Sequence, residues 1–278
     1  SKKPKKIIVG NFTNKNFIAR ILKKNKINVI FHLGAITQVL DSLENPYKTH
    51  KTNIMGTANF LENIRSINKK IIFIYSSSDK AYGELKKNSQ YKETDPLDSV
   101  YPYDVSKSAS DLLCQSYSKT YLMKVGIIRC GNIYGPGDFN FKRLIPEVIL
   151  STIVGKNFVI RSNGKSTRDY VYVEDVVDAY IKLFKKLKSS KSKLKIYNVS
   201  SKFNYSVIKI VKMILKIMNK ENLEPTVLNN SKQELNFQRL NYSKIQRELK
   251  WKPKTNINKG LIQTIDWYIK NYRFFRKK

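Results

Sequence analysis

Short apolar runs alternate with amphipathic stretches along the first half of the chain. The runs with the length of a strand are Lys6–Gly10, Val29–Ala35, Lys70–Tyr75 and Val125–Cys130. The stretches with apolar side chains at helical spacing are residues 16–24, 53–68 and 102–117. Asn53 stands where a helix N-terminus is expected, and Pro102 opens the next helix. This alternation predicts right-handed crossovers and a doubly wound parallel sheet, with Val29–Ala35 buried on both faces.

The pattern changes after Asn132. Gly135, Pro136, Gly137 and Asp138 predict a loop, and longer polar stretches separate the later elements. Amphipathic helices are expected over residues 173–186, 206–218 and 258–272. The fold class predicted is therefore α/β: a Rossmann-type core with a smaller C-terminal α/β domain.

The composition favours a globular protein with an anionic ligand. Lys and Arg total 53 against 21 Asp and Glu, a net charge of +32. A nucleic-acid binder is one interpretation, but the lysines are spread along the chain and no RNA- or zinc-binding motif accompanies them. A positive field of this kind favours anionic small molecules. Two cysteines, Cys114 and Cys130, and no run of about 20 apolar residues predict a cytoplasmic protein that does not span a membrane.

Polar residues follow three of the predicted strands. They are Gly34-Ala35, the segment 76–83 and the segment 129–138. Ligands of parallel sheets bind outside the carboxyl ends of the strands, so these segments are expected to line one crevice.

Tyr103 and Lys107 carry the strongest chemical signal. Four residues apart on a helix, they share one face. A nearby ammonium and a cationic nicotinamide would lower the phenol pKa toward the working range, so that Tyr103 could take a proton from a sugar hydroxyl. A Tyr-x-x-x-Lys pair found alone most often belongs to the solvent-exposed face of a helix. Tyr103 and Lys107 become a stronger catalytic candidate because a strand ending in serines precedes them and a strand ending in an Asn loop follows them.

Six motifs in order resemble the extended short-chain dehydrogenase/reductase family, which contains NAD-dependent nucleotide-sugar epimerases and 4,6-dehydratases. The motifs are Phe-His-Leu-Gly-Ala (31–35), Asn-Ile-Met-Gly-Thr (53–57), Ser-Ser-Asp-Lys-Ala-Tyr-Gly (77–83), Tyr-x-x-x-Lys (103–107), Arg-Cys-Gly-Asn-Ile-Tyr-Gly (129–135) and Arg-Asp-Tyr-Val-Tyr-Val-Glu-Asp-Val (168–176). Segments 249–253 and 260–268 resemble the family's C-terminal end. The resemblance implies a tightly held NAD, a nucleotide-diphosphate sugar as substrate, a role in surface polysaccharide synthesis and a homodimer formed through the helix of Tyr103.

The resemblance also implies the cofactor and substrate contacts. The residues implied for NAD, besides Tyr103 and Lys107, are Asn11, Phe12, Leu33, Gly34 and Ala35. Asn11 departs from the Asp usual beside the adenine. Ser78 is implied to bind the sugar 4-hydroxyl, Asn132 the phosphates, and Arg168, with Arg143 as a weaker candidate, the diphosphate. The expected NAD-binding domain comprises residues 1–135 and about 166–202. The expected substrate-binding domain comprises residues 203–278 and about 136–165.

The pair Asp79-Lys80 helps to decide between a dehydratase and an epimerase within the family. Family epimerases usually have apolar residues here, and many dehydratases have Asp-Glu. The Asp-Lys pair resembles CDP-glucose 4,6-dehydratases and some UDP-N-acetylglucosamine dehydratases. By analogy Asp79 is the general acid for the C6 hydroxyl, and Lys80 is the base at C5 or its electrostatic helper. The alternative is a surface ion pair between neighbours. An epimerase or reductase on the same scaffold remains the second functional hypothesis.

No Gly-x-x-Gly-x-x-Gly follows any strand, although the family binds the pyrophosphate with such a loop. We expect either that about 50–60 residues precede Ser1 in the intact protein, since a βαβ unit takes at least about 30, or that the chain is an inactive fragment or binding protein. NAD and NADP are not distinguished by these residues. The sequence has one other histidine, His50, and no spacing typical of metal ligands. His32 is therefore expected to be a packed strand residue, and no metal site is predicted.

Overall fold

The computed structural model describes residues 6–86, 88–229 and 235–275. The chain divides into two compact units. The first unit comprises residues 1–77, 100–127 and 184–195, and the second comprises 78–99, 128–183 and 196–278.

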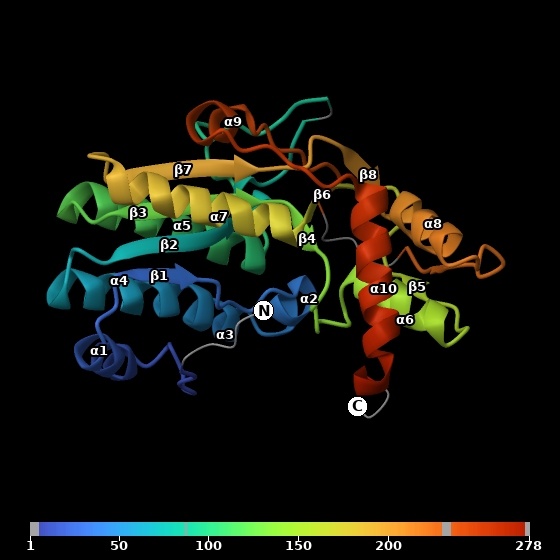
Figure 1. The fold of residues 1–278 in the computed structure, drawn as a ribbon, viewed down its shortest axis with the longest axis horizontal. Coiled ribbons are helices and arrows are strands. Elements are labelled where there is room, and N and C mark those ends of the chain that lie inside the picture. Colours follow the sequence, from blue (N-terminus) through green and yellow to red (C-terminus); the bar gives the residue numbers. More distant parts are fainter. Residues whose placement is uncertain (1–5, 87, 230–234, 276–278) are drawn as a thin grey trace. The chain divides into compact units, whose positions relative to one another are not determined.

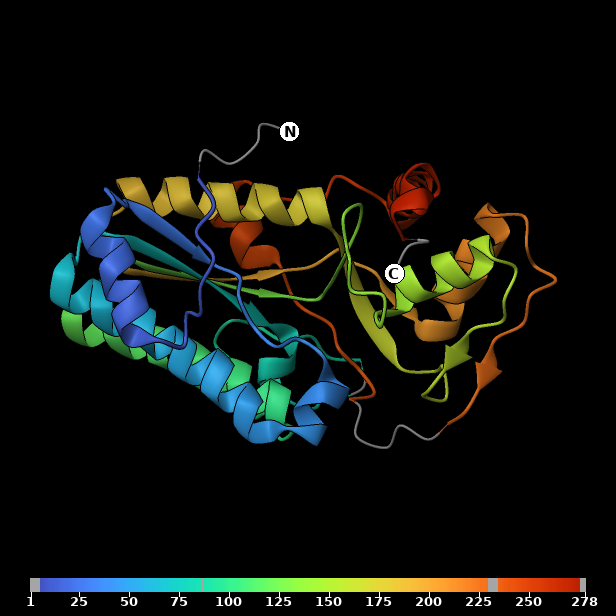
Figure 2. The same cartoon turned by 90° about the horizontal axis from the view of Figure 1, so that it is seen from below.

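The first unit is built on a sheet with helices packed against one face (Figures 1 and 2). Its strand order is β1 (Val29–His32), β2 (Ile72–Ser78), β3 (Val125–Cys130) and β7 (Leu194–Val199). β1 and β2 are parallel, with Val29 opposite Ile72. The helices on that face are α1 (Lys15–Lys24), α4 (Gly56–Ile67) and α5 (Pro102–Tyr121). Leu61 and Ile64 of α4 are buried, as the helical spacing predicts.

Two predictions about the first strands are wrong. Residues 6–10 form no strand or helix, and Val9 is 91% exposed. β1 is not buried on both faces, because Phe31 is exposed and Leu33, just after the strand, is 61% exposed. β1 lies at the end of the strand order, and among the described strands none pairs with its outer edge. Apolar runs adopt a buried strand only where neighbours supply a ladder and a covering layer.

The helix expected to begin after Asn53 begins earlier. α3 (Pro46–His50) continues into a π-helix, η1 (Lys51–Met55), and then into α4. Asn45 caps this run by accepting a hydrogen bond from the Lys48 amide at 3.0 Å, and Pro46 occupies the first turn. Asn53 is therefore an internal, buried residue rather than a cap.

The second unit contains two small sheets and a helical layer. β4 (Asn132–Tyr134) is parallel to β6 (Thr167–Tyr172), and β8 (Asn204–Ser206) is antiparallel to β6. β5 (Val159–Ile160) pairs with β9 (Thr226–Val227). The core is shared by α6 (Leu144–Ile153), α8 (Val207–Ile217) and α10 (Ile257–Phe275), which Figure 1 shows close together.

The remaining elements include both predicted and unpredicted ones. α7 (Val173–Ser189), α8 and α10 confirm the three amphipathic helices expected in the second half. Ser206 caps α8 through a 3.3 Å hydrogen bond from the Lys209 amide. The sequence did not predict α2 (Val39–Glu44), α6, α9 (Ser243–Leu249) or the short 3-10 helix η2 (Asp79–Tyr82).

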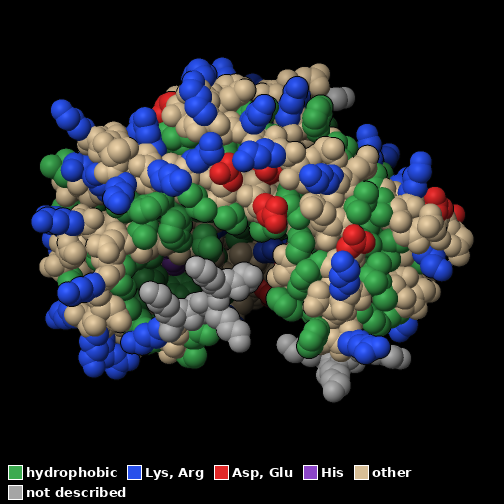
Figure 3. Space-filling view, viewed as in Figure 1, with side chains coloured by type: hydrophobic (Ala, Val, Ile, Leu, Met, Phe, Trp, Pro, Cys, Tyr) green, Lys and Arg blue, Asp and Glu red, His purple; other side chains and the backbone are tan. Residues whose placement is uncertain are grey.

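On the face that Figure 3 shows, charged side chains do not form one stripe. Figure 3 shows Lys and Arg scattered over the visible face, with apolar side chains between them. No helix in the described part of the chain is both long enough and apolar enough to cross a membrane.

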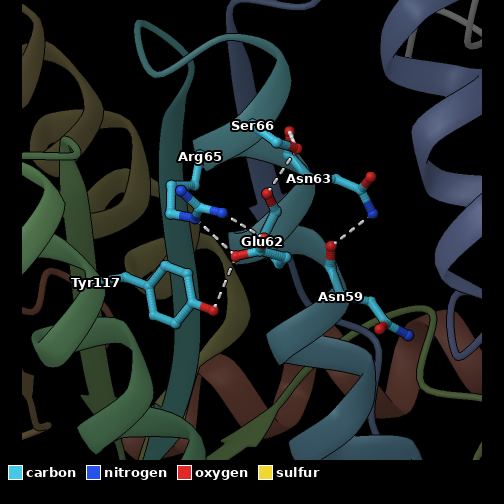
Figure 4. Close-up of polar contacts among 6 residues, drawn as sticks. All are labelled: Asn59, Glu62, Asn63, Arg65, Ser66 and Tyr117. Carbon is cyan, nitrogen blue, oxygen red and sulfur yellow. Dashed lines mark hydrogen bonds and ion pairs between the residues drawn. The ribbon is translucent and has the colours of Figure 1, made fainter.

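A polar cluster joins α4 to α5 (Figure 4). Arg65 donates two hydrogen bonds to the Glu62 carboxylate, at 2.8 and 2.7 Å, and the Tyr117 hydroxyl donates a third at 3.2 Å. The hydrogen bonds from Arg65 are the main cause of a Glu62 pKa lowered to about 2. These contacts tie α4 to the helix that carries Tyr103 and Lys107.

Candidate active site

Tyr103 and Lys107 are both buried on α5, one turn apart. The Lys107 ammonium donates to the Ser76 carbonyl at 2.5 Å and lies 5.0 Å from the centre of the Tyr75 ring. Burial lowers the Lys107 pKa to about 8, so the side chain still carries its charge at neutral pH. The structure therefore places a fixed cation near the carboxyl end of β2, on the helix face it shares with Tyr103.

A buried polar network holds the start of α5. The Asn53 amide donates to Ser106 Oγ at 2.8 Å, and Ser106 Oγ donates to the Tyr103 carbonyl at 2.7 Å. Asn53 also pairs with both backbone groups of Ile36, at 2.8 and 3.0 Å. The segment after β1 and the backbone of Tyr103 are thus connected through one amide. The sequence singled out Asn53 as part of a motif and as an expected helix start, but did not predict these contacts.

His32 is a packed strand residue, as expected. Its Nε2 lies 3.0 Å from Thr57 Oγ1, and its ring lies 4.9 Å from that of Phe60. Burial, with a smaller effect of the Lys107 charge, lowers the His32 pKa to about 3. The ring is therefore neutral at physiological pH. No group of three potential metal ligands occurs within the described ranges.

The residues predicted to contact the cofactor in the first unit have distinct environments. The Phe12 ring fills the space beside two glycines: a Cβ on Gly34 would lie 3.0 Å from the ring and one on Gly56 would lie 2.4 Å from it. Asn11 Oδ1 accepts hydrogen bonds from the Thr13 amide and hydroxyl, both at 2.9 Å. Leu33 and Gly34 are exposed, and Ala35 is half-buried. A side chain at residue 34 would therefore press on the Phe12 ring, and one at residue 56 would displace it.

Ser78 and Asp79 form a hydrogen-bonded pair at the start of η2 in the second unit. Ser78 Oγ donates to Asp79 Oδ1 at 3.0 Å and accepts from the Lys80 amide at 3.2 Å. Asp79 is 1% exposed, and its other oxygen, Oδ2, has no hydrogen-bond partner among the described residues. Lys80 is half-buried. A surface ion pair between Asp79 and Lys80 is therefore excluded, because Asp79 is not at the surface.

Burial dominates the electrostatics around Asp79. It raises the Asp79 pKa, against the smaller opposing effects of Lys80, the Ser78 hydrogen bond and Arg168. Arg168 is itself buried and donates to the Thr167 carbonyl at 3.0 Å. Burial thus shifts the Asp79 equilibrium toward the neutral acid, with a guanidinium close enough to act on its charge.

A second buried carboxyl, Asp169, lies on β6 next to Arg168. Its oxygens accept from the Ser201 amide at 2.9 Å, from the Ser201 hydroxyl at 3.0 Å and from the Ser200 hydroxyl. Burial raises the Asp169 pKa to about 6, and the charge of Asp79 adds to the rise. The sequence analysis missed this residue as an electrostatic partner, because only the fold brings it near Asp79.

The other predicted substrate residues lie elsewhere in the second unit. Asn132 begins β4 and is opposite Tyr170 of β6, so it is a strand residue and not a turn residue. Arg143 precedes α6 and forms an ion pair with Asp138 at 3.1 Å. The structure thus brings Asp79 and Arg168 into electrostatic contact, whereas Arg143 pairs with Asp138 of its own loop.

One further hydroxyl was not predicted. Ser77 Oγ is buried at the end of β2 and has no hydrogen-bond partner in the part of the chain that the structure describes. The run of three serines was the available signal, but it did not identify which hydroxyl lacks a partner.

Comparison with known proteins gives consistent matches. The family model described as GDP-mannose 4,6 dehydratase matches residues 1–264. A trifunctional UDP-glucose 4,6-dehydratase/3,5-epimerase/reductase of Arabidopsis thaliana is 30% identical over 96% of this chain and 39% of its own length. The human dTDP-D-glucose 4,6-dehydratase is 28% identical over 96% of this chain and 76% of its own length. The chain therefore spans about two fifths of the first relative and three quarters of the second.

Solved structures extend the match to the fold. A UDP-glucose 4-epimerase of Thermotoga maritima is 26% identical with a TM-score of 0.86, covering 95% of this chain and 84% of that one. A dTDP-glucose 4,6-dehydratase of Bacillus anthracis is 26% identical with a TM-score of 0.84, covering 96% and 81%. These matches confirm the predicted Rossmann-type α/β fold. The chain belongs to the GDP-mannose 4,6-dehydratase family of extended short-chain dehydrogenases.

Proposed function

We propose that the chain is an NAD-dependent nucleotide-sugar 4,6-dehydratase, which oxidises C4, removes water across C5 and C6, and reduces C6. The observation that carries the proposal is the Asp79 carboxyl, buried and with one oxygen unpartnered among the described residues. A buried polar atom without a partner is costly, and it is retained where a ligand supplies the missing partner.

The hydrogen bonds of Asp79 indicate which of its two carboxyl oxygens carries the proton in the neutral acid. Oδ1 accepts from Ser78 Oγ, so the proton of the neutral acid belongs on Oδ2. Oδ2–H is then the one available donor of this group, as a general acid for a leaving hydroxyl requires. Ser78 Oγ would bind the oxygen of the sugar 4-hydroxyl once its hydrogen turns from Asp79 to the ligand, because the hydrogen of that hydroxyl goes to Tyr103. Burial raises the pKa of Asp79, which favours the protonated form that a general acid needs.

Tyr103 and Lys107 would act at C4. The buried Lys107 cation favours the phenolate of Tyr103, which can then take the proton of the 4-hydroxyl. When bound, NAD⁺ accepts two electrons and a proton from C4 and returns them at C6. Lys107 would also hold the nicotinamide ribose.

The first unit fits part of NAD. Leu33, Gly34 and Ala35 would lie along the dinucleotide, since the exposed Gly34 leaves its backbone open. Phe12 would lie beside the adenine, with the Asn11 amide nitrogen as a donor, because its oxygen already accepts two hydrogen bonds. The sequence has no Gly-x-x-Gly-x-x-Gly, and none of its residues is assigned to the pyrophosphate.

The second unit would hold the remaining groups of the substrate. Lys80 would remove the C5 proton or stabilise the charge that forms there. Arg168 would bind the diphosphate, because a guanidinium matches phosphate geometry with two parallel hydrogen bonds. Asn132 would assist at the phosphates, and Arg143 would do so if its ion pair with Asp138 opens.

The Asp79-Lys80 pair supports a finer proposal, that the enzyme is of the CDP-glucose 4,6-dehydratase type. The second candidate is a 4-epimerase, which the likeness to the Thermotoga enzyme favours. An epimerase does not need an acid at C6, so the buried carboxyl of Asp79 supports the dehydratase.

Incubation of the protein and NAD⁺ with CDP-, dTDP-, UDP- and GDP-sugars tests the proposal. We expect one of them to lose water and give a 4-keto-6-deoxy sugar nucleotide by mass spectrometry. A C4 epimer without loss of water would overturn it. Asp79→Asn should slow turnover by about 10²- to 10⁴-fold, the contribution of a general acid, while C4 oxidation continues and reduced cofactor accumulates.

We also propose a homodimer formed through α4 and α5, the helix of Tyr103. The support is Leu112, an apolar side chain of α5 that is exposed in the single chain. Leu112→Lys should shift the mass measured by light scattering from dimer to monomer. Binding of NAD by residues 1–135 and about 166–202, and of the sugar nucleotide by the rest, stays part of this proposal.

A further inference from the structure

The turn that carries Asp79 ends on a tyrosine that points the same way. η2 is a single 3-10 turn from Asp79 to Tyr82. Side chains three residues apart in a 3-10 helix are eclipsed, so Asp79 and Tyr82 project from the same side of the turn. Whatever fixes the rotation of the Tyr82 side chain therefore also fixes the rotation of the turn and the direction of the Asp79 carboxyl.

Tyr82 is held at its ring and at its hydroxyl. Its hydroxyl donates to Asn198 Oδ1 at 2.7 Å and accepts from Arg129 Nη1 at 2.9 Å. The Arg129 guanidinium carbon lies 4.8 Å from the centre of the ring, and the ring of Tyr91 is stacked on it at 4.5 Å. Burial raises the pKa of Tyr82, so the hydroxyl keeps the hydrogen that Asn198 accepts.

The groups around Tyr82 are themselves fixed. Arg129 is 2% exposed and also donates to the Glu93 carbonyl at 3.3 Å. Asn198 donates from its backbone to Glu93 Oε1 at 2.8 Å and from its side chain to the Tyr91 carbonyl at 3.0 Å. A satisfied polar network of this kind has one low-energy arrangement, because turning any member leaves a buried group unpaired.

The far end of the turn is fixed as well. Gly83 has φ +85°, and a Cβ there would lie 1.9 Å from the Asp98 carbonyl oxygen. The Tyr91 hydroxyl donates to the Gly83 carbonyl. Ser78 caps the start of the turn, so the turn is anchored before and after Asp79.

Burying an arginine costs more free energy than burying an apolar side chain of similar volume. Removing a guanidinium from water costs several kcal/mol, and apolar side chains of similar volume often give equal or greater stability. Arg129 is therefore better explained by the orientation it imposes on Tyr82 than by packing.

We propose that Tyr82 and Arg129 are positioning residues that aim the Asp79 carboxyl at the leaving hydroxyl of the sugar. The inference rests on the proposed dehydratase function. Neither residue touches substrate; both act through the η2 turn. They should govern the loss of water while leaving C4 oxidation nearly unchanged.

The test is Tyr82→Phe, which removes the hydroxyl and keeps the ring. We expect water loss to slow by about 10- to 100-fold, since a misplacement of about 1 Å can cost that much, and C4 oxidation to change by less than about threefold on the same grounds. Single-turnover reactions separate the two steps, because reduced cofactor appears with oxidation and disappears after water loss. Arg129→Lys should reproduce the pattern, and Tyr82→Phe combined with it should add little.

Tyr117→Phe is the matched control. Its hydroxyl donates to Glu62 of α4 at 3.2 Å, and both residues belong to the first unit, whereas the turn belongs to the second. It should change neither step. Hydrogen exchange supplies a readout independent of turnover: amides of residues 78–83 should exchange faster in Tyr82→Phe and not in Tyr117→Phe.

The outcomes separate the two proposals. Equal loss of both steps, or unchanged steps with unchanged exchange, would overturn the positioning role. If the wild-type protein dehydrates no sugar nucleotide, but residues 78–83 exchange faster in Tyr82→Phe than in wild type, the proposed function is overturned and the anchoring of the turn is supported.

Discussion

The burial of Asp169 predicts how the stability of the folded protein depends on pH. The carboxyl is fully buried on β6, and burial is the main cause of a pKa raised from 3.8 to about 6. Replacing it by Asn keeps the shape and one oxygen to accept from Ser201, places an NH2 group opposite the Ser200 hydroxyl, and removes the ionisation. The difference in stability between the two proteins should then depend on pH.

The sign and the magnitude follow from linkage. A folded-state pKa above the unfolded value means that the folded protein binds the proton more tightly. The stability from this group is therefore complete below pH 3.8 and is lost as pH rises to about 6. At about 1.4 kcal/mol per pKa unit the loss is about 3 kcal/mol. For a chain of this size that corresponds to about 6–12 °C in the unfolding midpoint.

Thermal unfolding of wild type and Asp169→Asn from pH 4 to pH 7.5 measures the effect. As pH rises across this range, the unfolding midpoint of wild type should fall relative to that of Asp169→Asn. The difference between the two midpoints should change by most of the about 6–12 °C expected from the pKa shift. Asp266→Asn, on the exposed side of α10, controls for the loss of one carboxylate charge. A difference between wild type and Asp169→Asn that is flat with pH would refute the reasoning.

Three other predictions concern single side chains. Wild-type kcat/KM should fall as pH rises through about 8, because Lys107 then loses its charge, and Lys107→Arg should move that limb upward in a pH–rate profile. Gly131→Ala should lower the free energy of unfolding by about 1–3 kcal/mol in urea titrations, because the new Cβ would lie 2.4 Å from the Asp169 carbonyl oxygen. Arg168→Lys should raise KM for the sugar nucleotide about 10-fold or more, as loss of a charge-assisted hydrogen bond costs about 1.5–3 kcal/mol, with little change in the unfolding midpoint; an unchanged KM would remove Arg168 from the site.

The local elements were predictable because they depend on near neighbours in the sequence. α1, α5, α7, α8 and α10 were predicted to within a few residues, since apolar spacing and end residues such as Pro102 and Ser206 fix a helix locally. The Tyr103-Lys107 pair was also predictable, because four-residue spacing on a helix determines a shared face whatever surrounds it.

Features that depend on distant partners were not predictable. Residues 6–10 have the composition of a strand, but no described strand pairs with them. Asn53 has the chemistry of a cap, yet its contacts with Ile36 and Ser106 hold it inside a longer helical run. The network of Arg129, Tyr82 and Asn198 spans more than 100 residues of sequence, so spacing carries no trace of it.

Asp79 shows why the site needed the fold as well as the motif. From sequence, a surface ion pair between Asp79 and Lys80 remained the alternative, in which the carboxyl would be charged and catalytically inert. The structure buries Asp79 and leaves Oδ2 unpartnered in the described ranges, and burial raises the pKa of the carboxyl, which shifts it toward the protonated form. A dehydratase needs that proton at C6, whereas an epimerase has no use for it. The choice between the two therefore depends on the environment that the fold gives Asp79, and the motif alone could not supply it.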